Sequence, residues 1–288
     1  MNRRDLVLAL LVVTLWGANF TVIKLGLDGI PPMLLVALRY TFAVLPAIFF
    51  VKPPAVGWRC IVVYGMTVGV GQFACLFYAM NIGMPASVAS VVLQSQIYFT
   101  LVFAAIFLKE SIKGSQIAGL ATAGLGLYFI GGNIGSGETS LAIPLGPFLL
   151  TLLGAAFWGF SNIVVRYADK QSASSGKKLD MLSLVVWSSL VPPLPLLAFA
   201  LILDTPKTLL YAIINLQPVS VFAVFYLAFG ATLFGYYTWA MLLAKYPAGK
   251  AAQLSLLVPI AGLLTARIVL GEELSKMQWL GCAIVLTG

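Results

Sequence analysis

The sequence has no histidine and very little charge. Asp, Glu, Lys and Arg make up only 9% of its 288 residues, whereas soluble domains carry about 25%. Without histidine the chain lacks the commonest metal ligand and the usual proton-transfer group near neutral pH, so neither metal nor cofactor is expected. Its three cysteines, Cys60, Cys75 and Cys282, lie far apart on apolar runs. They have neither the paired spacing of a metal site nor the even number of a disulfide framework, so packing is their expected role.

Apolar residues dominate what remains. Hydrophobic residues make up 61% of the chain, and the mean hydropathy is +1.01. Because the polar remainder is too small to cover a globule of this size, lipid must solvate most of the outer surface. A net charge of +8 would suggest nucleic acid in a soluble protein. Here Lys and Arg fall mainly between apolar runs, which indicates topology signals and no nucleic-acid partner.

Charge, proline and glycine divide the chain into apolar runs of the length that crosses a bilayer. The predicted fold is therefore an all-α membrane protein with ten transmembrane helices. The runs are Leu6–Leu27, Pro31–Val51, Cys60–Met80, Pro85–Leu108, Ser115–Ile130, Pro147–Val165, Met181–Leu203, Val219–Leu243, Ala248–Leu270 and Met277–Gly288. The last run is too short to span, so the tenth helix is expected to be truncated in this chain and to continue beyond it.

An internal repeat relates the two halves of the chain. Leu15–Lys24 reads LWGANFTVIK and Phe157–Arg166 reads FWGFSNIVVR. Further matches at one constant spacing are Leu108-Lys109-Glu110 with Leu270-Gly271-Glu272, Gly119 with Gly281, and Pro85-Ala86-Ser87 with Pro247-Ala248-Gly249. These matches predict two five-helix repeats, residues 1–140 and 141–288. Because five is odd, the second repeat must be inverted, and inverted repeats around a central cavity are typical of secondary transporters.

The basic residues test this threading. With the N-terminus inside, twelve Lys and Arg fall on the inner side and four fall on the outer side: Lys24, Lys207, Arg267 and Lys276. This excess fits the positive-inside rule and predicts that both termini of the full-length protein are cytoplasmic. The Ser- and Lys-rich stretch Lys170–Lys178 is then expected to be a flexible inner linker.

The motifs resemble those of the drug/metabolite transporter superfamily in its ten-helix EamA branch. The residues that carry the resemblance are Trp16-Gly17 and Asn19, Trp158-Gly159, Pro85-Ala86-Ser87, Glu110, Glu272, Gly119 and Gly281. Within that branch the chain is similar to the YddG-type exporters of aromatic amino acids. The resemblance implies a bacterial inner-membrane protein with a cavity lined by spans one, three, four, six, eight and nine. One departure is that Gln96-Ile97 and Val258-Pro259 stand where the family often has Glu-Pro.

Two tryptophans near the middle of the membrane are the first candidates for the cavity lining. Trp16 lies about 15 Å into its helix at the rise of an α-helix, and Trp158 lies at a similar depth in span six. Asn19 follows Trp16 by three positions, and Ser161 and Asn162 follow Trp158 by three and four, so each tryptophan shares a helix face with a polar group. Helix packing with hydrogen bonds between helices is the alternative interpretation.

Span four adds polar side chains at middle depth. Gln94 and Tyr98 share a face at i and i+4, with Gln96 between them. Amides in hydrocarbon are costly, so these side chains are expected to face the protein interior or water. Weaker candidates for the same lining are Tyr78, Tyr236 and Trp239. For Tyr78 and Trp239 the alternative is the aromatic belt at the membrane interface.

Arg39 is the one charge in the middle of a span. Such charges are costly unless paired or hydrated, and they often mark functional sites. The prediction is that Arg39 bonds helix-end carbonyl groups, because span two belongs to the outer layer of the resembling fold. Contact with a substrate carboxylate is the alternative.

The predicted function is export of small amphipathic metabolites, especially aromatic or apolar amino acids, by alternating access. The expected partners are the small-molecule substrate and membrane lipid, with the protein as a monomer. A multidrug or quaternary-cation exporter is the alternative, but it would need a carboxylate or an aromatic cage, and no Asp or Glu lies in mid-span. A membrane enzyme or a receptor would show a catalytic constellation or a seven-helix pattern, and neither is visible. The exact substrate and the direction of transport stay open.

Overall fold

The computed structural model describes residues 1–131, 143–174, 176–246, 254–255 and 257–287. Within these ranges every regular element is a helix, so the all-α prediction is confirmed for the described part of the chain. In the first half the helices are α1 (Arg3–Leu27), α2 (Pro32–Ala47), α3 (Trp58–Tyr64), η1 (Gly65–Gln72), α4 (Phe73–Asn81), α5 (Ala86–Val92), η2 (Leu93–Ser95), α6 (Gln96–Leu108) and α7 (Gly114–Gly131). The segments α3, η1 and α4 form one continuous helix, and the segments α5, η2 and α6 form another.

The second half begins with the longest helix. Its helices are α8 (Leu145–Ser174), α9 (Met181–Ser188), α10 (Pro193–Leu203), α11 (Pro206–Ile214), α12 (Pro218–Phe225), η3 (Tyr226–Phe234), α13 (Gly235–Lys245), α15 (Leu257–Leu270) and α16 (Lys276–Thr287). Residues 247–253, which include the predicted match Pro247-Ala248-Gly249, lie outside the described residues.

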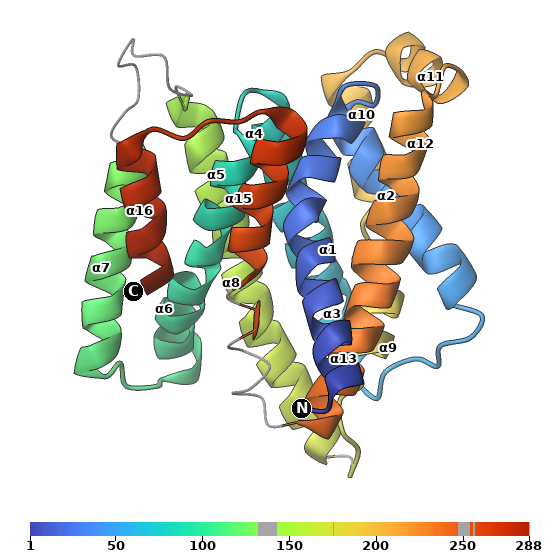
Figure 1. Ribbon diagram of the computed structural model, residues 1–288. Coiled ribbons are helices and arrows are strands. Elements are labelled where there is room, and N and C mark those ends of the chain that lie inside the picture. Colours follow the sequence, from blue (N-terminus) through green and yellow to red (C-terminus); the bar gives the residue numbers. More distant parts are fainter. Residues whose placement is uncertain (132–142, 175, 247–253, 256, 288) are drawn as a thin grey trace.

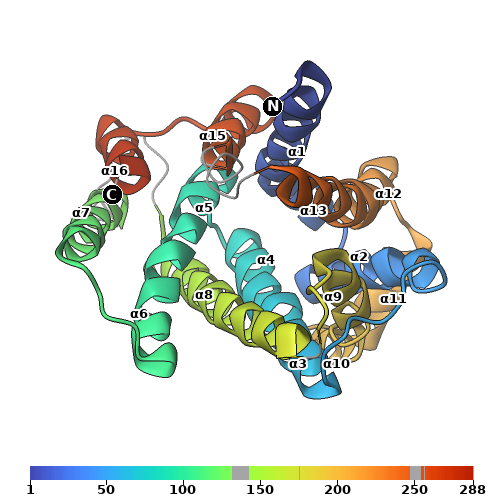
Figure 2. The same cartoon turned by 90° about the horizontal axis from the view of Figure 1, so that it is seen from below.

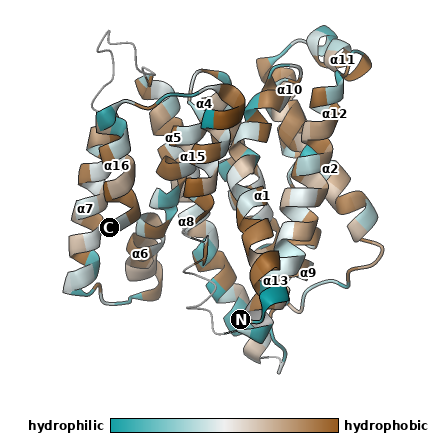
Figure 3. Ribbon diagram, viewed as in Figure 1, coloured by the Kyte–Doolittle hydropathy of each residue, from teal (hydrophilic) through white to brown (hydrophobic). Residues whose placement is uncertain are grey.

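Several helices are long and apolar enough to cross a membrane. Five of the described helices pass this test, and a sixth joins them if α9 and α10, bent by 41° at their break, count as one span. Three shorter apolar helices are α2, α7 up to Ile130, and α15. Large apolar side chains such as Phe50, 86% exposed, and Ile268, 79% exposed, face outward, and Figure 3 shows apolar residues along the outer helices. The chain is therefore a multi-pass membrane protein.

Two details differ from the sequence prediction. The flexible linker predicted from Lys170 is wrong in its first part, because α8 continues to Ser174. Gln171 accepts a hydrogen bond from the backbone of Gly57 at 3.0 Å, and the buried Ser172 donates to the carbonyl of Ala55, so contacts with the α2–α3 connection stabilise this extension. The short helix α11 was not predicted at all.

The two halves share local backbone features at equivalent positions. Lys109 and Gly271 each end a helix with a left-handed residue, at φ 56° and 67°. The next residue in each case, Glu110 or Glu272, donates its N–H to a carbonyl six residues earlier at 3.4 Å. These sites lie at opposite ends of the bundle: α6 ends at the lower end in Figure 1, where α1 begins, and α15 ends at the upper end.

A second shared feature is a π-helical segment in the third long helix of each half. In η1 and η3 the helix is widened by one residue per turn, and the segments end with the N–H of Phe73 bonding Val68 and that of Gly235 bonding Gly230. Tyr64 precedes η1, and Tyr226 begins η3. The spacing between these two tyrosines is the same as that between Glu110 and Glu272, so they occupy equivalent positions in the two halves. π-Helical turns are rare and are frequent at functional sites.

Helix α1 packs mainly against helices of the second half of the chain. It contacts α15, α12, η3 and α13, while α8 contacts α6, α4 and η1, and α2 packs on α10. The pair α7 and α16 stands at the edge when the bundle is seen from below (Figure 2). This arrangement brings α2, η1, α9 and η3 together around one internal cavity.

Candidate functional site

Three of the predicted aromatic residues form a cluster between α1 and α13. The ring of Trp16 lies 5.6 Å from that of Tyr236 and 5.2 Å from that of Trp239, measured between centroids. The indole Nε1 of Trp16 donates to the carbonyl of Ala231 at 2.9 Å. All three rings are only partly buried, and Tyr236 and Trp239 follow one another by three positions, on one helix face. The ring contact of Trp239 with Trp16 favours a place inside the bundle over the alternative role in the aromatic belt at the membrane interface.

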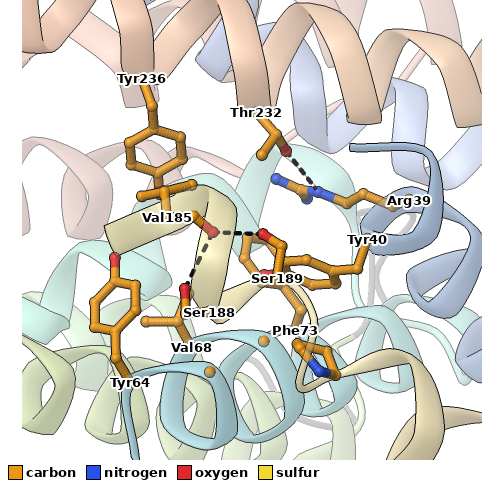
Figure 4. A pocket seen from close by; sticks show the side chains of 13 residues that line it. Arg39, Tyr40, Tyr64, Val68, Phe73, Val185, Ser188, Ser189, Thr232 and Tyr236 are labelled. Carbon is orange, nitrogen blue, oxygen red and sulfur yellow. Dashed lines mark hydrogen bonds between the residues drawn. The ribbon is translucent and has the colours of Figure 1, made fainter. Parts of the chain in front are cut away.

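Tyr236 also lines a narrow internal cavity that has room for about one water molecule. Side chains from four parts of the fold surround it (Figure 4). They are Arg39 and Tyr40 of α2, Tyr64, Gly65, Val68, Gly69 and Phe73 of the α3–η1–α4 helix, Val185, Ser188, Ser189 and Pro192 at the break between α9 and α10, and Thr232 and Tyr236 of the η3–α13 helix. The aromatic cluster and the cavity are therefore adjacent, with Tyr236 common to both.

Arg39 is buried in this cavity, with only 3% of its surface exposed. Its Nε donates to the hydroxyl of Thr232 at 3.2 Å, and its guanidinium carbon lies 4.1 Å from the ring centroid of Phe73, a cation–π contact. Its Nη1 has no hydrogen-bond partner. The prediction that Arg39 bonds helix-end carbonyl groups is therefore wrong. Span two is close enough to α4 and η3 for Arg39 to contact Phe73 of α4 and Thr232 of η3.

A polar contact joins α6 to α8. The amide nitrogen of Asn162 donates to Oε1 of Gln96 at 2.8 Å and to the hydroxyl of Thr100 at 2.9 Å. Ser161 donates to the carbonyl of Trp158, one turn earlier, at 2.7 Å. The hydrogen bonds of Asn162 thus connect α6 and α8, as expected from the alternative interpretation of helix packing. Contact of Asn162 with substrate stays a prediction.

Within the described residues, Tyr98, Tyr78, Asn19 and Gln94 are not part of the ring contacts that form the aromatic cluster. The hydroxyl of Tyr98 donates to the carbonyl of Val285 in α16 at 3.1 Å, and Tyr78 is half-buried against the core. Asn19 is 7% exposed, and its side-chain oxygen has no hydrogen-bond partner. Gln94, half-buried, lies in the 3₁₀ segment η2, which changes the helical phase between it and Tyr98.

The two glutamates in the repeated motif make different contacts at opposite ends of the bundle. At the upper end, Glu272 accepts the backbone N–H groups of Ala86 and Ser87, both at 2.8 Å, and the hydroxyl of Ser87. It thereby caps the first turn of α5. At the lower end, Glu110 forms a two-point ion pair with Arg166 of α8 at 2.6 and 3.0 Å. An open pocket lies beside Glu272 and is lined by Ser87, Leu263, Arg267, Glu273 and Trp279, among others.

Sequence reasoning missed several residues of the Arg39 cavity. Tyr40, Tyr64, Ser188, Ser189 and Thr232 line it, and none was a candidate. A signal was available for the two serines. They stand before a run of prolines in the middle of an apolar stretch, and prolines there break a transmembrane helix. A broken helix commonly borders a binding site in transporters.

An apolar helical bundle that encloses aromatic and polar side chains at its interior is the arrangement of a membrane transport protein. The chain belongs to the EamA-like transporter family, whose sequence model matches residues 4–132 and 145–288. The resemblance found in the motifs is thus confirmed.

Several named relatives support this membership. The chain is 41% identical over 288 residues to a "probable amino-acid metabolite efflux pump" of Escherichia coli K12, covering 100% of this chain and 94% of that protein. It has the same identity and coverage with the protein of that name from Salmonella typhimurium. A "probable terminal-alkyne amino-acid exporter" of Streptantibioticus cattleyicolor is 24% identical, with 98% of this chain and 90% of that protein covered.

A crystal structure of another protein shares the fold. The match has a TM-score of 0.62 and a sequence identity of 17%, and it covers 100% of this chain and 95% of the other chain. At that identity the likeness concerns the fold alone.

Proposed function

We propose that this protein is a secondary transporter that exports small amphipathic metabolites, above all aromatic and other apolar amino acids, by alternating access. The observation that carries this proposal is the adjacency of the Trp16 aromatic cluster and the Arg39 cavity, joined by Tyr236. An amino acid with an apolar side chain needs both apolar ring surface and polar groups. The names of the relatives from Escherichia coli, Salmonella typhimurium and Streptantibioticus cattleyicolor point to the same substrate class.

The proposed architecture is ten spans in two inverted repeats, residues 1–140 and 141–288, around a central cavity. It is supported by the two matched segments of the family and by the paired helix ends at Lys109 and Gly271, which lie at opposite ends of the bundle. Inverted repeats allow the halves to exchange conformations and so to open a site to each side in turn.

The proposed orientation places the lower end of the bundle in the cytoplasm of a bacterium, with the protein in the inner membrane. The N-terminus, the α6–α7 connection and the C-terminal end of α8 share that end (Figure 1). Six of the 17 Lys and Arg residues of the chain lie on these segments: Arg3, Arg4, Lys109, Lys113, Arg166 and Lys170. The positive-inside rule therefore favours a cytoplasmic lower end and cytoplasmic termini.

The proposed substrate contacts have the cluster of Trp16, Tyr236 and Trp239 at their centre. The other proposed contacts are Asn19, Tyr78, Gln94, Tyr98, Trp158, Ser161 and Asn162. The three side chains of the cluster are partly buried and in mutual ring contact, so ring surface is available for stacking against an apolar substrate. A quaternary cation would also bind aromatic faces. The buried positive charge of Arg39 beside Tyr236 disfavours it.

The test is transport by the purified protein in liposomes loaded with one labelled solute at a time. The solutes are L-phenylalanine, L-tryptophan, L-leucine and tetraethylammonium. The three amino acids are expected to leave faster than from protein-free liposomes, and Trp16→Ala is expected to reduce their flux at least fivefold. The matched control is Trp58→Ala, which truncates a tryptophan that is 59% exposed. Flux of tetraethylammonium alone would assign the protein to cation efflux. Full flux in Trp16→Ala would move the site away from this cluster.

A further inference from the structure

We propose that Arg39 anchors a carboxylate-binding subsite in the cavity between α2, η1, α9 and η3. The proposal deepens the proposed function and rests on it for the identity of the ligand, which would be the carboxylate of the exported amino acid. Arg39 is the group that pairs with the carboxylate, and the tyrosine hydroxyls around it supply further hydrogen bonds.

The first argument is the missing counter-charge. The part of the chain that the structure describes contains two ion pairs, Glu110 with Arg166 and Asp5 with Lys245, and Arg39 takes part in neither. A guanidinium group stays charged in a protein and has five N–H donors to satisfy. The Nε–H of Arg39 reaches Thr232, whereas Nη1 is buried without a partner. A buried charge of this kind is costly unless an anion pairs with it.

The second argument is that the unused groups of the cavity are hydrogen-bond donors. Within the described residues, the hydroxyls of Tyr40, Tyr64 and Tyr236 make no hydrogen bond, although all three side chains line the cavity. Ser188 and Ser189 already donate to the carbonyl of Val185, at 3.1 and 2.6 Å. The guanidinium of Arg39 can only donate and is positively charged, so it favours an acceptor with negative charge, and each of the three tyrosine hydroxyls can donate one further hydrogen bond to that acceptor. A carboxylate has two acceptor oxygens and matches the planar fork of a guanidinium.

The third argument is the direction in which the guanidinium group points. Figure 4 shows the Arg39 side chain extending from α2 into the space between Tyr236, Ser189 and Tyr40, with its Nε on Thr232. The ring of Trp16 lies 5.6 Å from that of Tyr236, measured between centroids. A ligand that places its carboxylate at Arg39 and its apolar part against Tyr236 would therefore lie next to the aromatic cluster.

The fourth argument is the irregular backbone around the cavity. The π-helical segments η1 and η3 and the break between α9 and α10 all supply lining residues. In membrane proteins such departures are tolerated where the backbone is buried in protein or lines a cavity. In transporters they recur at substrate sites.

The experiment measures binding, so that it does not depend on transport. Purified protein is titrated with labelled 3-phenylpropionate, which has a carboxylate and a ring but no ammonium group, and with 3-phenylpropionamide, in which a neutral amide replaces the carboxylate. The wild-type protein is expected to bind the carboxylate at least tenfold more tightly than the amide. Arg39→Gln is expected to remove this preference, Arg39→Lys to retain part of it, and the matched control Arg59→Gln, at an exposed arginine of α3, to leave it unchanged.

Two further arms keep the test decisive. If Arg39→Gln does not fold, Tyr236→Phe removes one hydroxyl and keeps the ring, and it is expected to weaken carboxylate binding about threefold without changing amide binding. Equal binding of carboxylate and amide by the wild-type protein, or an unchanged preference in Arg39→Gln, would overturn the subsite. Displacement of the probe by chloride as readily as by phenylalanine would overturn a substrate role. Arg39-dependent carboxylate binding in a protein that moves no amino acid would instead leave the subsite standing and reject the proposed function.

Discussion

Glu272 is expected to hold the upper ends of α15 and α5 together, and replacing it with glutamine should loosen them. Its carboxylate accepts two backbone N–H groups at 2.8 Å and the hydroxyl of Ser87. Glutamine keeps one acceptor oxygen and loses the charge, so at least one of these donors loses its partner. Hydrogen bonds to a charged group contribute about 1.5–3 kcal/mol, and an anion at a helix N-terminus adds about 0.3–1 kcal/mol. Because Glu272 is partly exposed, we expect a net loss of roughly 1–3 kcal/mol, which corresponds to about 5–150-fold in an equilibrium between closed and open upper ends.

The assay reports access to the pocket beside Glu272. Leu263 lines this pocket and is 6% exposed, so a cysteine there is expected to react slowly with a membrane-impermeant thiol reagent. In a background without the three native cysteines, Glu272→Gln should raise the labelling rate of Leu263→Cys at least fivefold. The matched control is Glu273→Gln, which removes the same charge from the next residue, an exposed side chain without a hydrogen bond in the described part of the chain.

Two results would refute this reasoning. A labelling rate that stays within twofold of the parent in Glu272→Gln would show that the contact does not control access. An equal increase in Glu273→Gln would show that charge at the upper end matters and the hydrogen bonds to α5 do not.

Two further predictions concern orientation and energy coupling. In intact cells a membrane-impermeant thiol reagent should label Lys207→Cys in α11 and should not label Ser174→Cys at the end of α8, because the two lie at opposite ends of the bundle; the reverse pattern would invert the topology. In liposomes at zero membrane potential, substrate should flow down its own gradient without a pH gradient, because the chain lacks histidine and its acidic residues fall at span ends or in connections. Uphill flux that requires a pH gradient and is lost in Glu110→Gln would contradict it.

The all-helical, multi-pass character of the chain could be predicted from the sequence because lipid imposes a simple rule. A span needs a long apolar run, and such runs are visible without any tertiary information. Helix α11 was not predicted because its nine residues are too few to span a membrane, and its apolar residues, such as Leu210 and Ile214, are exposed. The extension of α8 to Ser174 was not predicted because the composition of this stretch indicates a linker. In the structure, contacts with the α2–α3 connection stabilise the helix.

The candidate site could be predicted only in part. Depth along a helix marked Trp16 as a candidate for the cavity lining, and in the structure Trp16 is half-buried in ring contact with Tyr236 and Trp239. What depth cannot give is the partner helix. Tyr98 has the depth of a cavity residue, yet its hydroxyl bonds α16. Arg39 was assigned to an outer layer, because the sequence does not reveal that α4 and the widened turn of η3 pack against α2.

The widened turns and the broken helix also bear on how a bound ligand could act on the rest of the protein. In η3 the hydroxyl of Thr232 donates to the carbonyl of Leu227, five residues earlier, at 2.8 Å and accepts the Nε–H of Arg39. A ligand that draws the guanidinium group away from Thr232 therefore changes the hydrogen bonding of a π-helical turn, a rare type of segment that is frequent at functional sites. The same turn carries Ala231, whose carbonyl holds the indole of Trp16. Binding at Arg39 and stacking at Trp16 thus act on one short stretch of η3. Since a ligand shifts a conformational equilibrium only by contacts that differ between the two states, this stretch is where we expect substrate binding and helix movement to be coupled.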